Sequence, residues 1–292
     1  MAIRLTPLEL GKIIFKSCVS WFRDDAPSMG ASIAFYTLFA VTPILLIVIW
    51  AAGKFIAPEI VQAHILEQLR LLLGGTGEAA VGSLLTSARA GERGGLSTAL
   101  GLIALFFGAT SVFAELQNAL QRIWRTPPLG VAQGLWQVVR GRLLSFVLMI
   151  GVGFLLLVSL VATAGIQGLK PWLSAYVGHW RGLMFALDGL LGFGLATLLF
   201  AMIYKYLPRE EIAWGDVWVG SAVTAGLFTA GKWMIVFYLG RASFTSIYGV
   251  AGSFLVFLLW VYYSAQIFLL GAEFTRNFAY EQGSRTGRTT AA

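Results

Sequence analysis

Residues 33–52 read IAFYTLFAVTPILLIVIWAA, twenty positions without a charged side chain. About 20 apolar residues in a helix cross the hydrocarbon core of a bilayer. Five more stretches have a similar length and character: Leu96–Phe113, Leu143–Ala164, Leu183–Tyr204, Val217–Leu239 and Gly252–Ala272. Because lipid offers no water to backbone groups, only helices or closed barrels span it, and these stretches lack the alternation of barrel strands. The sequence predicts an all-α, polytopic membrane protein with six transmembrane helices and amphipathic helices at both surfaces.

The composition also indicates a membrane protein. Hydrophobic residues make up 58% of the chain and charged residues 12%, with a mean hydropathy of +0.77, whereas soluble domains carry about 25% charged residues. The net charge of +7 does not indicate a nucleic-acid partner, because the basic residues are distributed among the connections rather than gathered on one face. A single cysteine, Cys18, excludes an internal disulfide.

The distribution of basic residues predicts the orientation. With both termini on one side of the membrane, 13 Lys and Arg lie on that side and seven on the other, while Lys232 lies inside a span. Because cytoplasmic loops are enriched in Lys and Arg, we expect both termini in the cytoplasm. The N-terminus does not resemble a cleavable signal peptide, because Lys12, Lys16 and Arg23 interrupt its apolar runs.

We expect three parts along the chain. Residues 1–25 form a cytoplasmic amphipathic helix, followed by a break at Asp24 and Asp25. This helix either lies in the headgroups with its cations over anionic lipid or packs against the bundle. One helical stripe carries Leu10, Ile14, Cys18 and Trp21. Residues 26–278 form the membrane domain, with a helical loop at 53–95 on the outer face, and residues 279–292 form a disordered cytoplasmic tail.

Ionisable residues at membrane depth are the candidate functional residues, because charges are costly in lipid. Asp188 and Lys232 both lie about 8 to 11 Å below the outer boundary. They are candidates for an ion pair, either a structural clamp or part of a transport site. Glu115 and Glu273 lie at the inner ends of the second and sixth spans. Together with the neighbouring Arg122, Arg125 and Arg276 they form either a cytoplasmic gate or ordinary interfacial charges.

No pattern in the sequence indicates an enzyme. His64 and His179 both lie in predicted outer connections, and neither has partners at metal-ligand spacing. The nucleophile-elbow, P-loop and dinucleotide-binding motifs are absent. We therefore expect no catalytic residue, no cofactor and no bound metal.

Several segments together resemble the YihY/virulence factor BrkB family of bacterial inner-membrane proteins, and the resemblance covers residues 13–277. They are GASIAFYTLF at 30–39 with Pro43, the stretch 113–124, Leu207-Pro208, Gly220, Lys232, Tyr238, Tyr248-Gly249, Leu259-Trp260 and LLGAE at 269–273. Phe35 departs from the pattern, in which a second tyrosine is common. The resemblance implies six spans, an inner-membrane location and a role in the cell envelope. The family also carries a ribonuclease BN label, which the residue inventory argues against.

The function expected from these observations is the movement or gating of a lipid, a lipid-linked glycan or another amphiphile along a cleft between glycine-rich helices. Membrane lipids are the expected partners, and Asp188, Lys232, Glu115 and Glu273 are the polar groups available to line such a path. One alternative is an envelope scaffold with no transported substrate, and an intramembrane enzyme is a third. No residue pattern identifies a cargo, an energy source or an oligomeric state.

Overall fold

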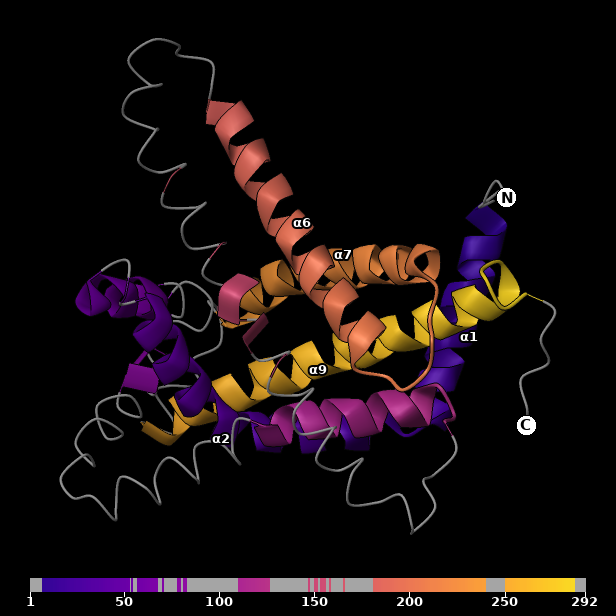
Figure 1. The fold of residues 1–292 in the computed structure, drawn as a ribbon, viewed down its shortest axis with the longest axis horizontal. Helices are drawn as coiled ribbons and strands as arrows, with labels where there is room; N and C mark the ends of the chain where they lie inside the picture. Colours follow the sequence, from indigo (N-terminus) through magenta and orange to yellow (C-terminus); the bar gives the residue numbers. More distant parts are fainter. Residues whose placement is uncertain are drawn as a thin grey trace.

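The computed structural model describes residues 7–52, 54, 57–67, 70, 78–79, 81–82, 110–126, 147, 150–151, 153–155, 158, 165, 181–239 and 250–286. The regular structure of these residues is helical throughout, with no strand among them (Figure 1). The labelled helices are α1 (Pro7–Arg23), α2 (Ala26–Ala52), α6 (Arg181–Tyr206), α7 (Trp214–Leu239) and α9 (Val250–Glu281). Residues 110–123 form a further helix. The predicted all-α class is confirmed for the described residues.

Four of the six predicted spans coincide with α2, α6, α7 and α9. The second predicted span is described only from residue 110, and the third only at a few positions, all of them helical. Within the part of the chain that the structure describes, two helical segments are long and apolar enough to cross a membrane, Gly189–Tyr206 and Phe257–Glu281. The number of six spans therefore stays a prediction. The loop at 53–95 lies largely outside the described residues, and its described part includes a helix at 58–67.

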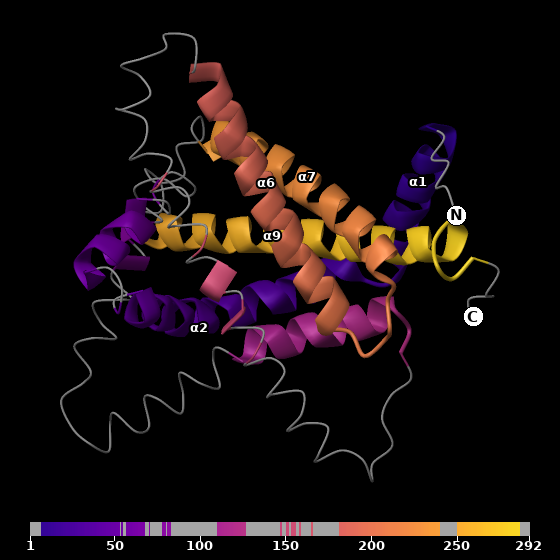
Figure 2. The ribbon, with the colours of Figure 1, turned by 45° about the horizontal axis from the view of Figure 1, so that its top comes forward.

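α1 and α2 are separated at the predicted break. Asp25 has a φ of 58°, a left-handed conformation that aspartate tolerates better than most residues. Its carbonyl accepts hydrogen bonds from the amides of Ser28 and Met29 in the first turn of α2. The chain thereby turns sharply, and α1 crosses the end of α9 in both views (Figures 1 and 2).

α1 packs against the bundle through Ile13 together with two members of the predicted apolar stripe, Leu10 and Trp21. Ile13 is buried with Phe274 and Phe278 of α9, and the side chain of Asn277 donates a hydrogen bond to Ser17 at 3.2 Å. Ile14, which belongs to the same predicted stripe, is 46% exposed. The sequence pattern was ambiguous because α1 carries apolar side chains on more than one face.

α7 and α9 meet through two matching glycine–threonine pairs. α7 carries Gly220 and Thr224, and α9 carries Gly271 and Thr275. Each threonine hydroxyl donates to the carbonyl of the glycine four residues earlier on its own helix, at 2.7 Å. A Cβ on Gly220 would collide with Thr275, and a Cβ on Gly271 with Thr224. The helices are thus antiparallel and interdigitate, as small residues allow in membrane proteins.

Tyr204 ties α6 to this pair. It is 1% exposed, and its hydroxyl donates to the carbonyl of Phe268 at 2.7 Å and lies 3.2 Å from Thr224 Oγ1. The ring packs against those of Phe200 and Phe268. A buried tyrosine needs a partner for its hydroxyl. These contacts therefore fix the position of α6 along the axes of α7 and α9.

The first part of the predicted disordered tail, residues 279–286, is ordered. α9 continues to Glu281, and residues 282–286, which we call the C-terminal turn, are held by hydrogen bonds. The polar composition that indicated disorder instead supplies partners for α7 and for the connection between α6 and α7. Residues 287–292 lie outside the described residues.

We expect Gly220→Ala to destabilise the protein, because the new methyl group collides with Thr275 in a tight helix contact. Overpacking of this kind costs about 1–3 kcal/mol. The matched control is Gly226→Ala on the same helix, where no atom of another described segment lies within 4 Å of the new Cβ. Thermal unfolding in detergent should show a lower melting temperature for Gly220→Ala only. Equal melting temperatures for the two variants would contradict the α7–α9 contact.

Candidate functional site

Two oppositely charged side chains are buried near the end of α9. Glu273 is 0% exposed and Arg276 is 4% exposed, and both lie within the candidate span Phe257–Glu281. Arg276 Nη1 lies 3.9 Å from Glu273 Oε2. Both carboxylate oxygens of Glu273 and the Nε of Arg276 are buried without a hydrogen-bond partner among the described residues. Such charges are costly at membrane depth and commonly functional.

Helix geometry directs these side chains away from α7. Successive residues of a helix are rotated by about 100°, so Glu273 projects about 200° from Gly271, which faces α7. The turn between α1 and α2 lies on that other side of α9. Two contacts place it there. Before the turn, the side chain of Asn277 donates a hydrogen bond to Ser17. After the turn, Gln266 Nε2 lies 3.5 Å from the backbone carbonyls of Ala26 and Pro27.

Asp24 and Arg125 complete a charged cluster with Glu273 and Arg276. The carboxyl of Asp24 lies beside that of Glu273, and the charge of Arg125 acts on both α9 residues. Asp24 Oδ2 is buried and has no hydrogen-bond donor among the described residues. Arg125 follows the 110–123 helix with a φ of 52°. The charged cluster therefore joins three separate segments and contains two acids and two bases.

This arrangement has a defined electrostatic character. With all four groups ionised the formal charges cancel, which lowers the cost of burying them. Two adjacent carboxyls without a donor repel each other unless a proton lies between them or cations stand close by. The charged cluster can thus respond to a proton or to a movement that separates its segments. It has no nucleophile–base pair of the kind that covalent catalysis requires.

The four predicted site residues lie in different environments in the structure. Glu273 is in the charged cluster together with its predicted neighbours Arg125 and Arg276. Glu115 is half-buried and accepts a hydrogen bond from Asn118 at 3.4 Å instead. Lys232 is exposed on α7, whereas the side chain of Asp188 lies outside the described residues. The Asp188–Lys232 pair therefore stays a prediction.

Asp24 is the member of the charged cluster that sequence reasoning missed. It was interpreted only as part of a helix break. Its position two residues before the first turn of α2 gave no indication that the break packs against α9. The pairing of Ser17 with Asn277 is equally invisible in the sequence, because these residues are 260 positions apart.

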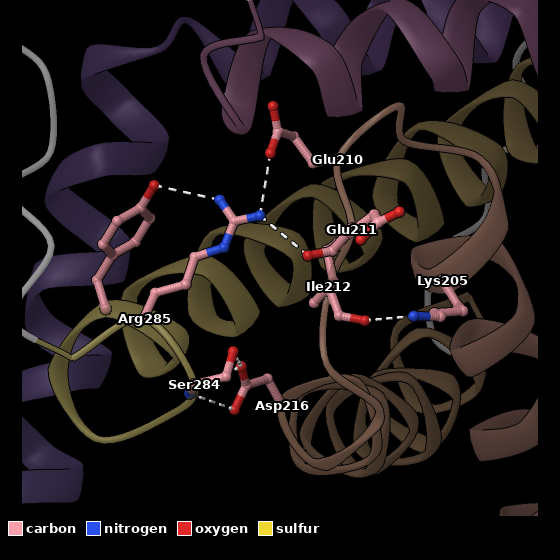
Figure 3. Close-up of polar contacts among 8 residues, drawn as sticks. Lys205, Glu210, Glu211, Ile212, Asp216, Ser284 and Arg285 are labelled. Atoms are coloured by element: carbon pink, nitrogen blue, oxygen red, sulfur yellow. Dashed lines mark hydrogen bonds and ion pairs between the residues drawn. The ribbon is translucent and has the colours of Figure 1, made fainter.

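A second polar network holds the C-terminal turn against the other helices (Figure 3). The backbone amide of Ser284 donates to Asp216 Oδ2 at 3.2 Å, and the Ser284 hydroxyl donates to the same oxygen at 2.6 Å. Arg285 Nη2 lies 3.0 Å from Glu210 Oε2 and 3.0 Å from the carbonyl of Glu211. The turn thus bridges the start of α7 and the connection between α6 and α7.

Aromatic rings enclose the guanidinium of Arg285. Its Cζ lies 5.2 Å from the ring centre of Trp124 and 5.8 Å from that of Tyr280, distances typical of cation–π contacts. Desolvation lowers the pKa of Arg285, but hydrogen bonds to Tyr280 and Glu210 outweigh it, so the pKa is raised overall. Arg285 therefore stays charged, and the strength of the contact depends on Glu210.

A family model described as virulence factor BrkB matches residues 18–292, nearly the whole chain. The chain belongs to the BrkB family. A UPF0761 membrane protein of Ralstonia nicotianae is 27% identical to it over 253 residues, which are 86% of this chain and 55% of that protein. A UPF0761 membrane protein of Neisseria meningitidis serogroup B is 26% identical over 275 residues, 90% of this chain and 64% of that protein.

These comparisons confirm the resemblance seen in the sequence and make the chain a membrane protein of the BrkB family. The chain spans between 55% and 64% of the length of these two relatives. Their names state no enzymatic activity. No solved structure matches the chain. In the described part of this BrkB-family chain, no group of three or more His, Cys, Asp or Glu side chains is arranged to hold a metal ion.

We expect Arg276→Gln to destabilise the protein strongly, because it leaves two buried carboxyls facing Arg125 alone. Removing one partner of a buried ion pair costs about 3–5 kcal/mol. The double variant Glu273→Gln/Arg276→Gln keeps Asp24 and Arg125 in balance and should recover part of that loss. Unfolding free energies in detergent measure both effects. A double variant that loses the sum of the losses measured for Glu273→Gln and Arg276→Gln singly would show that the side chains are not coupled.

We expect Glu210→Ala to loosen the C-terminal turn, because it removes the side-chain acceptor of Arg285. Glu211→Ala is the matched control, since Glu211 contacts Arg285 through its backbone carbonyl. Limited trypsin digestion followed by mass spectrometry should show faster cleavage after Arg285 in Glu210→Ala only. Equal cleavage rates in both variants would argue against the ion pair.

Proposed function

We propose that this protein moves or gates an amphiphile, such as a lipid or lipid-linked glycan, across or within the bacterial inner membrane. The observation that carries the proposal is the charged cluster, because apolar side chains would pack the same position in α9 at lower cost. A retained buried charge within a candidate span is a functional hypothesis by default. Six spans and cytoplasmic termini are part of the proposal.

The geometry of α6 supports a path beside the bundle. Near Tyr204 the helix is packed against α7 and α9, but its first half extends away from α9 in both views (Figures 1 and 2) and away from α7 in Figure 1. Gly189, Gly192 and Gly194 lie on this half and are exposed, and a methyl group added to any of them would meet no atom of another described segment within 4 Å. A smooth, open helix surface suits the passage of an acyl chain.

In this proposal the charged cluster acts as the gate. It joins the α1–α2 turn, the end of the 110–123 helix and α9 at the end of the bundle that carries both termini (Figure 1). Separating these segments exposes Asp24, Arg125, Glu273 and Arg276 to water and to a polar headgroup. The same groups neutralise one another when the segments close, which keeps the closed state stable.

The rival function is an envelope scaffold with no transported substrate. The dense contacts of the C-terminal turn favour it, since Asp216 and Glu210 hold this end of the chain in one arrangement. A scaffold has no requirement for a charged cluster that opens. The two functions thus differ in whether the charged cluster changes its exposure.

Reconstitution in vesicles tests the proposal. Fluorescent lipids with zwitterionic, anionic and glycan headgroups would be incorporated in both leaflets, and a membrane-impermeant quencher would report their movement. We expect transfer by the natural chain and at least a tenfold slower rate for Glu273→Gln/Arg276→Gln, with Glu115→Gln as a control outside the charged cluster. Absence of movement for every headgroup would favour the scaffold, and equal rates in all variants would remove the charged cluster from the mechanism.

A further inference from the structure

α1 has two apolar faces, of which the bundle covers one. Ile13 and Ser17 are 0% and 1% exposed against α9. On the opposite side four large side chains are exposed: Ile14 at 46%, Phe15 at 72%, Val19 at 51% and Phe22 at 71%. At about 100° per residue these four form one continuous arc of the helix surface. Two exposed phenylalanines in one arc are costly in water.

Cations border this apolar arc. Lys12, Lys16 and Arg23 are exposed, and helical periodicity places them side by side next to Val19. Lys16 Nζ also lies 2.6 Å from Glu281 but remains 55% exposed. The outer surface of α1 is thus divided lengthwise into an apolar half and a basic half. This division is typical of helices that lie in the plane of a membrane interface.

The position of α1 in the fold suits such a helix. It contacts the last turns of the candidate span, through Phe274, Asn277, Phe278 and Glu281. It also crosses α9 rather than running along it (Figures 1 and 2). If α9 crosses the bilayer, α1 then lies near one membrane surface, with its long axis close to the membrane plane.

We propose that the outer surface of α1 is a binding site for anionic phospholipid headgroups. Phe15, Val19 and Phe22 enter the acyl region, while Lys12, Lys16 and Arg23 contact phosphate and the additional negative charge of the lipid. Charge complementarity selects the occupant, because a neutral protein surface or a zwitterionic lipid offers no net negative charge to Lys12, Arg23 and the exposed part of Lys16, which Glu281 pairs from one side only. The site is independent of any amphiphile that the bundle moves.

The single cysteine makes a direct test feasible. Cys18 is free and lies four residues from both Ile14 and Phe22, on the same helix face. A bimane fluorophore attached there reports the lipid next to α1. The full chain would be reconstituted in equal parts of phosphatidylcholine and phosphatidylglycerol, with brominated acyl chains on one lipid or on the other. The two samples have identical headgroup compositions, so a difference in quenching measures which lipid is enriched at α1.

We expect brominated phosphatidylglycerol to quench the fluorophore more than brominated phosphatidylcholine does. Each cation near an anionic surface favours binding by about fivefold, so Lys12→Gln/Arg23→Gln should abolish most of the difference. Arg70→Gln/Arg209→Gln is the matched control, because it removes two exposed cations that lie outside α1 and outside the proposed path. High salt should reduce the difference for the natural chain.

Three results would overturn the proposal. Equal quenching by the two brominated lipids would mean that α1 has no preference for anionic headgroups. An equal effect of both double variants would mean that net charge, rather than this surface, attracts the lipid. Absence of quenching by either lipid would mean that something other than the bilayer, such as a protein partner, covers α1.

Discussion

The contact between α7 and α9 is the constraint on which the described structure depends. Helices in lipid gain little from burying apolar surface against each other, so close approach and backbone packing must stabilise them. Gly220 receives Thr275 and Gly271 receives Thr224, which sets the register of the two helices. The hydroxyl of Tyr204 on α6 then donates a hydrogen bond to the carbonyl of Phe268, which joins α6 to α9 near this contact.

That register determines where charge is buried. Because Gly271 and Thr275 face α7, the residue between them at Glu273 projects to the other side of α9. The α1–α2 turn and the end of the 110–123 helix close over that side, bringing Asp24 and Arg125 to Glu273 and Arg276. One end of the bundle is thus held by charges, whereas Ile49, Val61, Val81 and Phe257 form an apolar cluster elsewhere in the fold.

The polar contacts gather at the end of the bundle that carries both termini. The charged cluster is buried there, the C-terminal turn binds Asp216 and Glu210, and α1 presents its basic residues outward. At the other end, the half of α6 that carries Gly189, Gly192 and Gly194 extends away from α9 (Figures 1 and 2). The described part of the chain thus has a polar end held by many contacts and an apolar half of α6 that extends away from it, and the proposed path rests on this asymmetry.

The sequence by itself determined the helical class, the positions of α2, α6, α7 and α9, the break at Asp24 and Asp25, and the family. Long apolar runs and turn residues are local signals, and a bilayer permits few alternatives to helices. Only the tertiary structure decided that Asp24 meets Glu273, that α1 packs through Ile13 rather than Ile14, and that Ser284 binds Asp216. Helices such as α7 carry apolar residues around their whole circumference, so the hydrophobic periodicity does not indicate which face packs against the protein. Packing in the folded structure alone selects the neighbours.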